Sequence, residues 1–213
     1  VWLAEREKTD QKRVFKFCFE IDKVKSLKRE LTLLRTLQSY LQDEDNFVRL
    51  LDWNFDEPPF YLELEYAKGG DLRDWAQREG GIANIPLKTR LEIARQVAKA
   101  VADAHELQVL HCDIKPTNIL FDREGVHLPK VRLADFGVGR VVDRSLLRSN
   151  MITATGLTTD EDSTSSGASS SKKAGTRVYM APEVQQGENH TAASDIYAIG
   201  VVIYQLLAGD LRK

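Results

Sequence analysis

Apolar and polar side chains alternate with period two along residues 13–19, RVFKFCF. This alternation predicts a β-strand, because successive side chains of a strand point to opposite faces. Val14, Lys16 and Cys18 share one face of the predicted strand, and the three phenylalanines of the run share the other. The pattern therefore places a lysine between apolar neighbours on one face of a strand.

Residues 21–37 change to a helical pattern. The leucines at helical spacing are Leu27, Leu31, Leu34 and Leu37. They mark one face of an amphipathic helix, and Glu30 falls inside their stripe. A carboxylate on a packed face normally needs a cationic partner, so we expect Glu30 to pair with a basic side chain from another element.

The remaining pattern divides the chain into a strand-rich part and a helical part. Two runs, 47–53 and 60–66, have strand character, and a glycine turn follows the second. Beyond Asp71 helices predominate, with two short strands predicted at 118–121 and 131–134. We therefore expect an α+β protein with two lobes: a small antiparallel β-rich N-terminal lobe with one helix, residues 1–66, and a mainly α-helical lobe, residues 67–213.

Two helices are predicted in more detail within the second lobe. Pro86 stands where a long helix begins, and that helix is expected to run to about His105. The residues expected on its inner face are Leu91, Ala94, Ala98 and Val101. The apolar run 196–208 is too short to span a bilayer, so we expect a buried core helix there and no membrane segment within the chain.

Composition excludes several functional classes. The formal net charge of −2 is no basis for attracting nucleic acid or an anionic membrane. Two cysteines cannot form a disulfide framework, which favours a reducing, cytoplasmic environment, although an anchor outside this chain remains compatible with it. Residues 149–171 are dominated by serine, threonine and small residues, so we expect a mobile low-complexity insert there.

Polar residues with catalytic potential gather in HCDIKPTNIL, residues 111–120, and LADFG follows at 133–137. Together with RVFKF, LKRELTLL, LELEYAKGGDL, GTRVYMAPE and SDIYAIGVVIYQLLAG, these motifs resemble the eukaryotic-like protein kinases, and the bacterial serine/threonine kinases in particular. The resemblance covers essentially the whole chain and implies a bilobal fold. It also implies ATP and Mg²⁺ as cofactors and protein substrates with serine or threonine acceptors, as in signalling.

The resemblance assigns the catalytic roles. Lys16 resembles the lysine that holds the inner phosphates of ATP, and Glu30 resembles its helix partner, with Glu20 as a weaker candidate. Asp113 resembles the residue that accepts the proton of the substrate hydroxyl, and Lys115 the lysine that steadies the transferring phosphate.

Three further residues complete this assignment. Asn118 and Asp135 supply oxygen ligands of the kind that Mg²⁺ prefers. Thr176 is similar to the threonine that hydrogen-bonds the catalytic aspartate and lysine.

The resemblance also implies a nucleotide site. Its hinge would span Leu64 to Ala67, including Glu65, with Leu64 guarding the deeper pocket. The residues expected around the nucleotide are Val1, Val14, Lys16, Leu64, Glu65, Ala67, Asp71 and Leu120. Asp71 is compatible with two roles, ribose binding and capping of the helix that follows it. The glycine-rich loop is expected before Val1 and the last helices beyond Lys213, so we expect a catalytic-domain fragment that is weakly active by itself.

Four other expectations follow from the sequence and the resemblance. Asp195 would anchor the backbone around His111, whereas the histidines at positions 105, 127 and 190 have no spacing typical of ligands. Cys112 occupies the place where regulated kinases carry an arginine that reads a phosphate on the activation segment, residues 135–183. A cysteine cannot make that contact, so we expect a small buried filler there. Autophosphorylation is expected within 149–176.

Two alternative functions are compatible with this fold. A pseudokinase-type binding or scaffold module would have the same fold, but such proteins typically lack at least one of the residues that this chain retains. A small-molecule phosphotransferase of related fold is disfavoured by GTRVYMAPE, a segment associated with protein substrates.

Overall fold

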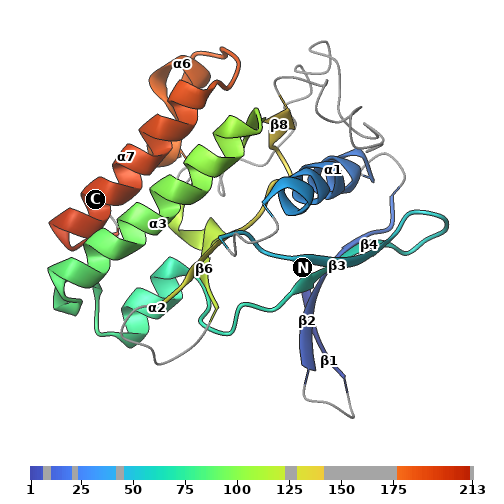
Figure 1. The fold of residues 1–213 in the computed structure, drawn as a ribbon, viewed down its shortest axis with the longest axis horizontal. Coiled ribbons are helices and arrows are strands. Elements are labelled where there is room, and N and C mark those ends of the chain that lie inside the picture. Colours follow the sequence, from blue (N-terminus) through green and yellow to red (C-terminus); the bar gives the residue numbers. More distant parts are fainter. Residues whose placement is uncertain (7–10, 21–23, 42–45, 123–128, 142–176, 212–213) are drawn as a thin grey trace.

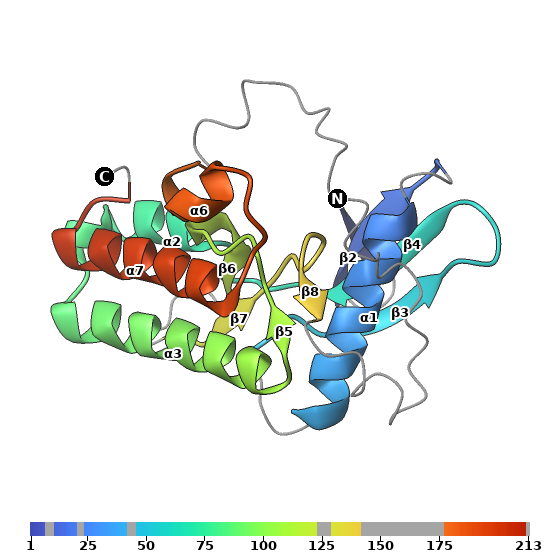
Figure 2. The same ribbon diagram turned by 90° about the horizontal axis from the view of Figure 1, so that it is seen from above.

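The computed structural model of the protein describes residues 1–6, 11–20, 24–41, 46–122, 129–141 and 177–211. A β-sheet with one helix forms one end of the molecule, and a group of helices forms the other (Figures 1 and 2). This arrangement confirms the α+β, bilobal expectation. A continuous apolar core runs through both ends, from Leu33 and Leu62 to Phe136, Val97 and Leu206.

The sheet has four antiparallel strands in the order β1-β2-β4-β3. These are β1 (Trp2–Arg6), β2 (Gln11–Cys18), β4 (Phe60–Glu65) and β3 (Leu50–Asn54). The helix α1 (Val24–Tyr40) packs against this sheet (Figure 1). The third strand was predicted too early, at 47–53: Phe47 makes only an isolated bridge to Leu133, and regular pairing begins at Leu50.

The two faces of β2 differ as predicted from its alternation. On one face Phe15 stacks on Phe17 with ring centroids 5.5 Å apart, and Phe17 stacks on Phe19 at 6.2 Å. Tyr61 of the paired strand meets the first two rings edge-on. The aromatic side is thereby occupied by ring–ring packing, which leaves Lys16 on the face that looks toward the inside of the molecule.

The helical end is built on α3 (Leu87–Glu106) and α7 (Ala192–Ala208), which lie side by side in Figures 1 and 2. The two helices are antiparallel, because Arg90 near the start of α3 donates to the carbonyl of Leu206 near the end of α7 at 2.9 Å. Shorter elements surround them: α2 (Leu72–Arg78), η2 (Ile82–Asn84), η5 (Arg177–Tyr179) and α6 (Pro182–Gln185).

Two small antiparallel pairs connect the sheet to the helices. One joins β5 (Val109–Leu110) to β8 (Arg140–Val141), and the other joins β6 (Ile119–Phe121) to β7 (Val131–Leu133). The short 3₁₀ helix η3 (Pro116–Asn118) stands directly before β6. The polar residues of 111–118 therefore lie between β5 and β6, two short strands that belong to separate pairs.

The buried faces of the helices differ in part from the predicted ones. Leu91 was expected on the inner face of α3 but is 48% exposed, and Ile93 and Val97 are buried instead. Likewise the run 196–208 is not buried all round: Ile196 is 57% exposed and Tyr204 is 59% exposed. Both errors have one cause, since an apolar residue on the solvent side of a helix is common and sequence alone does not reveal it.

Candidate active site

A three-residue charge cluster joins the sheet, α1 and the segment after β7. Lys16 Nζ lies 2.5 Å from Glu30 Oε1 and 3.0 Å from Asp135 Oδ1. Glu30 is only 2% exposed. The structure thus confirms the expected pairing of Glu30, with Lys16 as its cation, and it brings in Asp135 from far along the chain.

Both carboxylates of this cluster attract Lys16, whereas burial raises the pKa of Glu30 despite that lysine. Burial alone would lower the pKa of Lys16, but the two carboxylates outweigh it and raise that pKa above the usual lysine value. Burial alone would raise the pKa of Asp135, and Lys16 outweighs it in the opposite direction, so that this pKa is lowered. Lys16 and Asp135 are therefore both ionised at neutral pH.

The loop 111–118 forms a second cluster around Asp113. Lys115 Nζ lies 2.6 Å from Asp113 Oδ2. The side-chain amide of Asn118 donates to the backbone carbonyl of Asp113 at 2.8 Å and to its carboxylate at 3.1 Å. An ammonium and an amide thus orient the Asp113 carboxylate.

His111 connects this loop to the Asp-Phe-Gly turn. Its Nε2 lies 3.0 Å from the carbonyl of Ala134, and its Nδ1 accepts from the backbone N–H of Asp113 at 3.2 Å. A carbonyl only accepts, so the proton is on Nε2 and the ring is neutral. Burial lowers the pKa of His111, which agrees with a neutral ring. The imidazole therefore acts as a fixed spacer between the two clusters.

The carboxylate of Asp195, at the start of α7, binds the backbone of the same loop, as the resemblance implies. Its carboxylate accepts the backbone N–H groups of His111 at 2.8 Å and Cys112 at 2.9 Å. It also lies 3.0 Å from Nε2 of His105. Burial would raise the pKa of Asp195, but the bond from His105 and the two amides outweigh it and hold that pKa below the usual range.

Sequence reasoning missed His105. Its position at the end of α3 carries no ligand-like spacing, and only the fold places it against Asp195, 90 residues further along the chain. Of the other two histidines, His190 is half-buried, and position 127 lies outside the described residues.

Two residues of the site have unusual backbone conformations. Cys112 has a φ of 65° and Asp135 a φ of 69°, both in the left-handed region that side chains other than glycine rarely adopt. The backbone N–H of Cys112 is bound by Asp195, and the carboxylate of Asp135 is bound by Lys16. Such strain persists where the surrounding structure determines it, and it is concentrated at functional sites.

Cys112 was expected to be a small buried filler, but its side chain is only half-buried. Burial, with the neighbouring carboxylate of Asp195, raises the pKa of its thiol to about 12. The thiol is therefore protonated at neutral pH. It lines a small cavity of 30 Å³ together with Asp113, Tyr179 and His190.

Of the residues predicted to bind the nucleotide, Val14, Leu64 and Leu120 lie against one core, whereas Val1 is exposed. Val14 and Leu64 are cross-strand partners between β2 and β4, two residue pairs away from Lys16 and Leu62. Leu120 of β6 packs against the same core and makes a bridge to Asp71. By contrast, Val1 is 86% exposed at the edge of the sheet.

The predicted hinge, Leu64 to Ala67, begins with the last two residues of β4. Ala67 is 8% exposed. Glu65 accepts the backbone N–H of Arg49 at 3.1 Å and lies 3.6 Å from Nε of Arg132, so its side chain turns toward the rear of the hinge. Asp71 caps α2 by accepting the N–H groups of Arg73 and Asp74. The capping role of Asp71 is therefore the one that the structure shows.

Several predicted features lie outside the described residues, namely Thr176, the insert 149–171 and most of the activation segment. Among the described residues no group of three or more histidine, cysteine or acidic side chains is placed to hold a metal ion. Mg²⁺ is usually held by one or two carboxylates together with substrate phosphates. The Asp135 side chain is 48% exposed, and the amide nitrogen of Asn118 points to Asp113, so both can present an oxygen. The two residues fit such a site.

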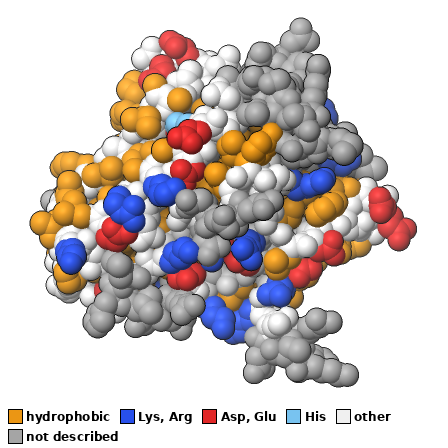
Figure 3. Space-filling view, viewed as in Figure 1, with side chains coloured by type: hydrophobic (Ala, Val, Ile, Leu, Met, Phe, Trp, Pro, Cys, Tyr) orange, Lys and Arg blue, Asp and Glu red, His pale blue; other side chains and the backbone are white. Residues whose placement is uncertain are grey.

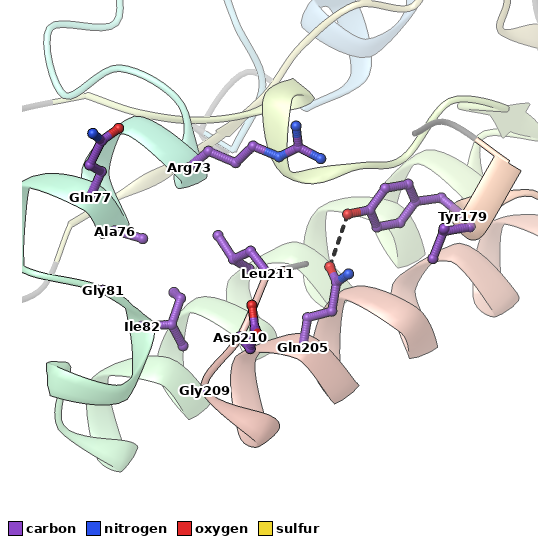
Figure 4. A pocket seen from close by; sticks show the side chains of 11 residues that line it. Arg73, Ala76, Gln77, Gly81, Ile82, Tyr179, Gln205, Gly209, Asp210 and Leu211 are labelled. Atoms are coloured by element: carbon purple, nitrogen blue, oxygen red, sulfur yellow. Dashed lines mark hydrogen bonds between the residues drawn. The ribbon is translucent and has the colours of Figure 1, made fainter. Parts of the chain in front are cut away.

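A larger cavity of 630 Å³ lies away from both charge clusters, between α2, η5 and the end of α7 (Figure 4). Inside it the hydroxyl of Tyr179 donates to Oε1 of Gln205 at 3.0 Å. Tyr179 also lines the small cavity beside Asp113, so the two cavities share one wall.

The described surface carries charges of both signs. On the face shown in Figure 3, basic and acidic side chains are interspersed and form no extended patch of one sign. Among the described helices, none combines the length and apolar character that crossing a bilayer requires.

Residues 1–212 match the family model described as "Protein kinase domain". The chain is 33% identical over 171 residues to the serine/threonine-protein kinase PrkC of Bacillus subtilis. The aligned region makes up 79% of this chain and 22% of that protein. It is 28% identical to the probable serine/threonine-protein kinase CPE1738 of Clostridium perfringens, over 87% of the chain and 22% of that protein. The human serine/threonine-protein kinase ULK1 is 30% identical over 86% of the chain. The chain spans 15% of the length of that human protein and about a fifth of the two bacterial ones.

Proposed function

Because the chain belongs to the protein kinase domain family, we propose that it transfers the γ-phosphoryl group of ATP to serine or threonine hydroxyls of protein substrates in signalling. The observation that carries the proposal is the pairing of Lys16 with both Glu30 and Asp135, beside an oriented Asp113. Phosphoryl transfer needs phosphates held, charge neutralised and a hydroxyl aimed in line. The two clusters supply groups of these kinds.

In this proposal Lys16 binds the inner phosphates, and Glu30 keeps its ammonium in place. Asp113 accepts the proton of the substrate hydroxyl, and Lys115 steadies the phosphoryl group in transfer. Asn118 and Asp135 would hold Mg²⁺, which supplies charge neutralisation when bound. Thr176, by its resemblance, would complete the set around Asp113 and Lys115.

The adenine ring is proposed to lie between Val14 above and Leu120 below. Leu64 would close the deeper end, and the backbone from Glu65 to Ala67 would bind the ring edge. The support is that Val14, Leu64 and Leu120 border a common core on the inner side of the sheet. Asp71 is available to ribose through the carboxylate oxygen that does not cap α2.

Val1 is proposed to cover the nucleotide from the edge of the sheet. We also propose that residues 1–66 and 67–213 form the two lobes, with the activation segment at 135–183. Autophosphorylation within 149–176 is proposed on its density of hydroxyl groups, and a cytoplasmic location on the two free thiols.

A pseudokinase role is the rival from another class. It is disfavoured because the residues that bind phosphate, metal and substrate proton are all present in the sequence. Their geometry also agrees with catalysis, since the Lys16–Glu30 distance is 2.5 Å and Asp113 has an ammonium at 2.6 Å. A small-molecule phosphotransferase is disfavoured by the segment GTRVYMAPE.

The test is phosphate incorporation from radiolabelled ATP into a generic serine/threonine substrate. It uses the longest natural polypeptide that contains this chain. Asp135→Ala is expected to abolish transfer, and Asp113→Asn to lower the rate about 10²- to 10⁴-fold, the usual worth of a general base. Glu106→Gln, which changes an exposed carboxylate on α3, is the matched control and should keep the parental rate. Parental rates in either site variant would overturn the proposal.

A further inference from the structure

The hydroxyl residues of α1 differ in where their hydrogen bonds go. Thr36 and Ser39 each donate to the carbonyl four residues earlier in the helix, to Thr32 and Arg35. Such back-bonding is the ordinary behaviour of a hydroxyl inside a helix. Ser26 lies in the first turn of α1, and its Oγ donates instead to the carbonyl of Gly137 at 3.0 Å, 111 residues away.

This bond ends at the Asp-Phe-Gly turn, beside the charge cluster of the active site. Three oxygens surround Gly137. A Cβ built on that glycine would lie 3.4 Å from Oδ1 of Asp135, 3.5 Å from Oγ of Ser26 and 3.8 Å from Oε2 of Glu30. The Ser26 hydroxyl thus shares one small space with both carboxylates that hold Lys16.

The unphosphorylated hydroxyl of Ser26 is compatible with the two nearby carboxylates because it is a neutral hydrogen-bond donor. It binds a carbonyl of the turn and adds no charge next to the two carboxylates. It therefore fixes the distance between the start of α1 and the turn, and Glu30 and Asp135 keep their positions on either side of Lys16.

A phosphate on the same oxygen would have the opposite effect. It carries about −1.5 to −2 charges at neutral pH and has no proton to donate to the carbonyl. Its distance from Glu30 and Asp135 would fall within the Debye length of about 8 Å, so their repulsion would be little screened. It would also compete with both carboxylates for Lys16. Ser26 is exposed, so a modifying enzyme can reach it.

We propose that Ser26 is a positioning residue and a phosphorylation site that controls the active site. The free hydroxyl holds the Asp-Phe-Gly turn against α1, and phosphorylation releases it. In the modifying step the Ser26 oxygen bonds to the γ-phosphorus of ATP and the bond to the β,γ-bridging oxygen breaks. ADP leaves with that electron pair, and the hydroxyl proton passes to the base of the modifying serine/threonine kinase.

The catalytic part of this inference rests on the proposed function and is tested by kinetics on the full polypeptide. Ser26→Ala is expected to lower kcat about two- to tenfold, the usual worth of one hydrogen bond. KM for the protein substrate should stay unchanged, because the substrate does not touch Ser26. Ser26→Thr keeps the hydroxyl and should restore the parental rate. Ser39→Ala, whose hydroxyl bonds within α1, should have no effect.

The modification is tested with phosphoserine incorporated genetically at position 26, and at position 39 as its control. The protein phosphorylated at 26 should turn over at least about tenfold more slowly than Ser26→Ala, because repulsion is added to the lost bond. Phosphatase should restore the rate. A Ser26→Ala variant at the parental rate, or phosphoserine 26 as active as that variant, would overturn the proposal.

A second measurement separates this inference from the proposed function. Amide hydrogen exchange of residues 136–141 does not depend on turnover, and both Ser26→Ala and phosphoserine 26 should speed it relative to the parent and to the Ser39 variants. If the parent transfers no phosphate, the proposed function fails while the exchange data still decide whether Ser26 holds the turn. Unchanged exchange in both Ser26 proteins would refute the role of Ser26.

Discussion

Replacing Asp195 by asparagine tests the bonds that hold the loop 111–118. The carboxylate is 2% exposed and accepts three N–H groups, from His111, Cys112 and the ring of His105. An asparagine keeps the shape but turns one acceptor into a donor, so at least one of these N–H groups meets another N–H. A hydrogen bond to a charged acceptor is worth about 1.5–3 kcal/mol, and the bonds that remain become neutral and weaker.

We therefore expect Asp195→Asn to lower the free energy of unfolding by about 3 kcal/mol. The assay is equilibrium unfolding in urea at neutral pH, read as a change in midpoint at constant slope. Glu92→Gln is the matched control: its carboxylate pairs with Arg95 at 2.6 Å, the side chains are 26% and 63% exposed, and such solvent-exposed pairs contribute at most about 1 kcal/mol. Equal losses in the two variants, or a loss below about 1 kcal/mol for Asp195→Asn, would refute the reasoning.

The same substitution has a predicted pH dependence. The pKa of Asp195 is lowered in the folded state, so its contribution is fully present above the unfolded value of about 3.9 and is lost as the pH falls through the folded value. The stability difference between parent and Asp195→Asn should therefore be constant from about pH 7 to pH 5 and shrink below about pH 4. A difference that widens in acid would show that the carboxylate is not stabilised by its donors.

Other outcomes follow from single residues. Gly139→Ala should destabilise the fold by about 1–3 kcal/mol in urea unfolding, because a Cβ there would lie 2.7 Å from Leu33 and 2.9 Å from a backbone oxygen. Gly200→Ala in α7 meets nothing within 4 Å and should instead stabilise by about 0.5–1 kcal/mol. Cys112→Arg should not raise the initial rate, and phosphatase treatment should leave most of the activity; a loss of about a hundredfold would show that a loop phosphate is still read. Iodoacetamide at about pH 8 should label Cys112 only as fast as the protein unfolds, since its pKa is about 12. Mass spectrometry of active protein should find phosphate between residues 149 and 176, and phosphate found only elsewhere would contradict that expectation.

The strand and helix types were largely predictable because their periods are local. The alternation of 13–19 identified β2 and the face that carries Lys16. Errors arose where a neighbour decides the outcome. Phe47 has strand character but pairs only with Leu133, and Leu91 fits the α3 stripe but has nothing packed over it. The local sequence pattern indicates which secondary structure a segment prefers. Where a strand begins and which face of a helix is buried depend on the neighbouring elements that pack against it.

The candidate site was predictable to the extent that its geometry is carried by short motifs. Asp113, Lys115 and Asn118 are separated by a few residues on one loop, so their spacing already places them together. The position of Glu30 within a stripe of leucines predicted that its carboxylate has a cationic partner. His105 and Ser26 left no such sign, because each is an ordinary residue at its own position and acquires a role only through a distant partner.

The contacts that sequence reasoning missed have a common feature. His105 bonds Asp195 across 90 residues, and Ser26 bonds Gly137 across 111 residues. Ser26 joins α1 to the turn that carries Asp135, whereas His105 joins α3 to Asp195 of α7, whose carboxylate in turn holds the backbone of His111 and Cys112. The candidate site residues are set by motif, but their relative placement depends on these long-range bonds. A variant that keeps every motif and loses one such bond should therefore bind its ligands and yet transfer phosphate slowly, because misplacement costs rate more than affinity.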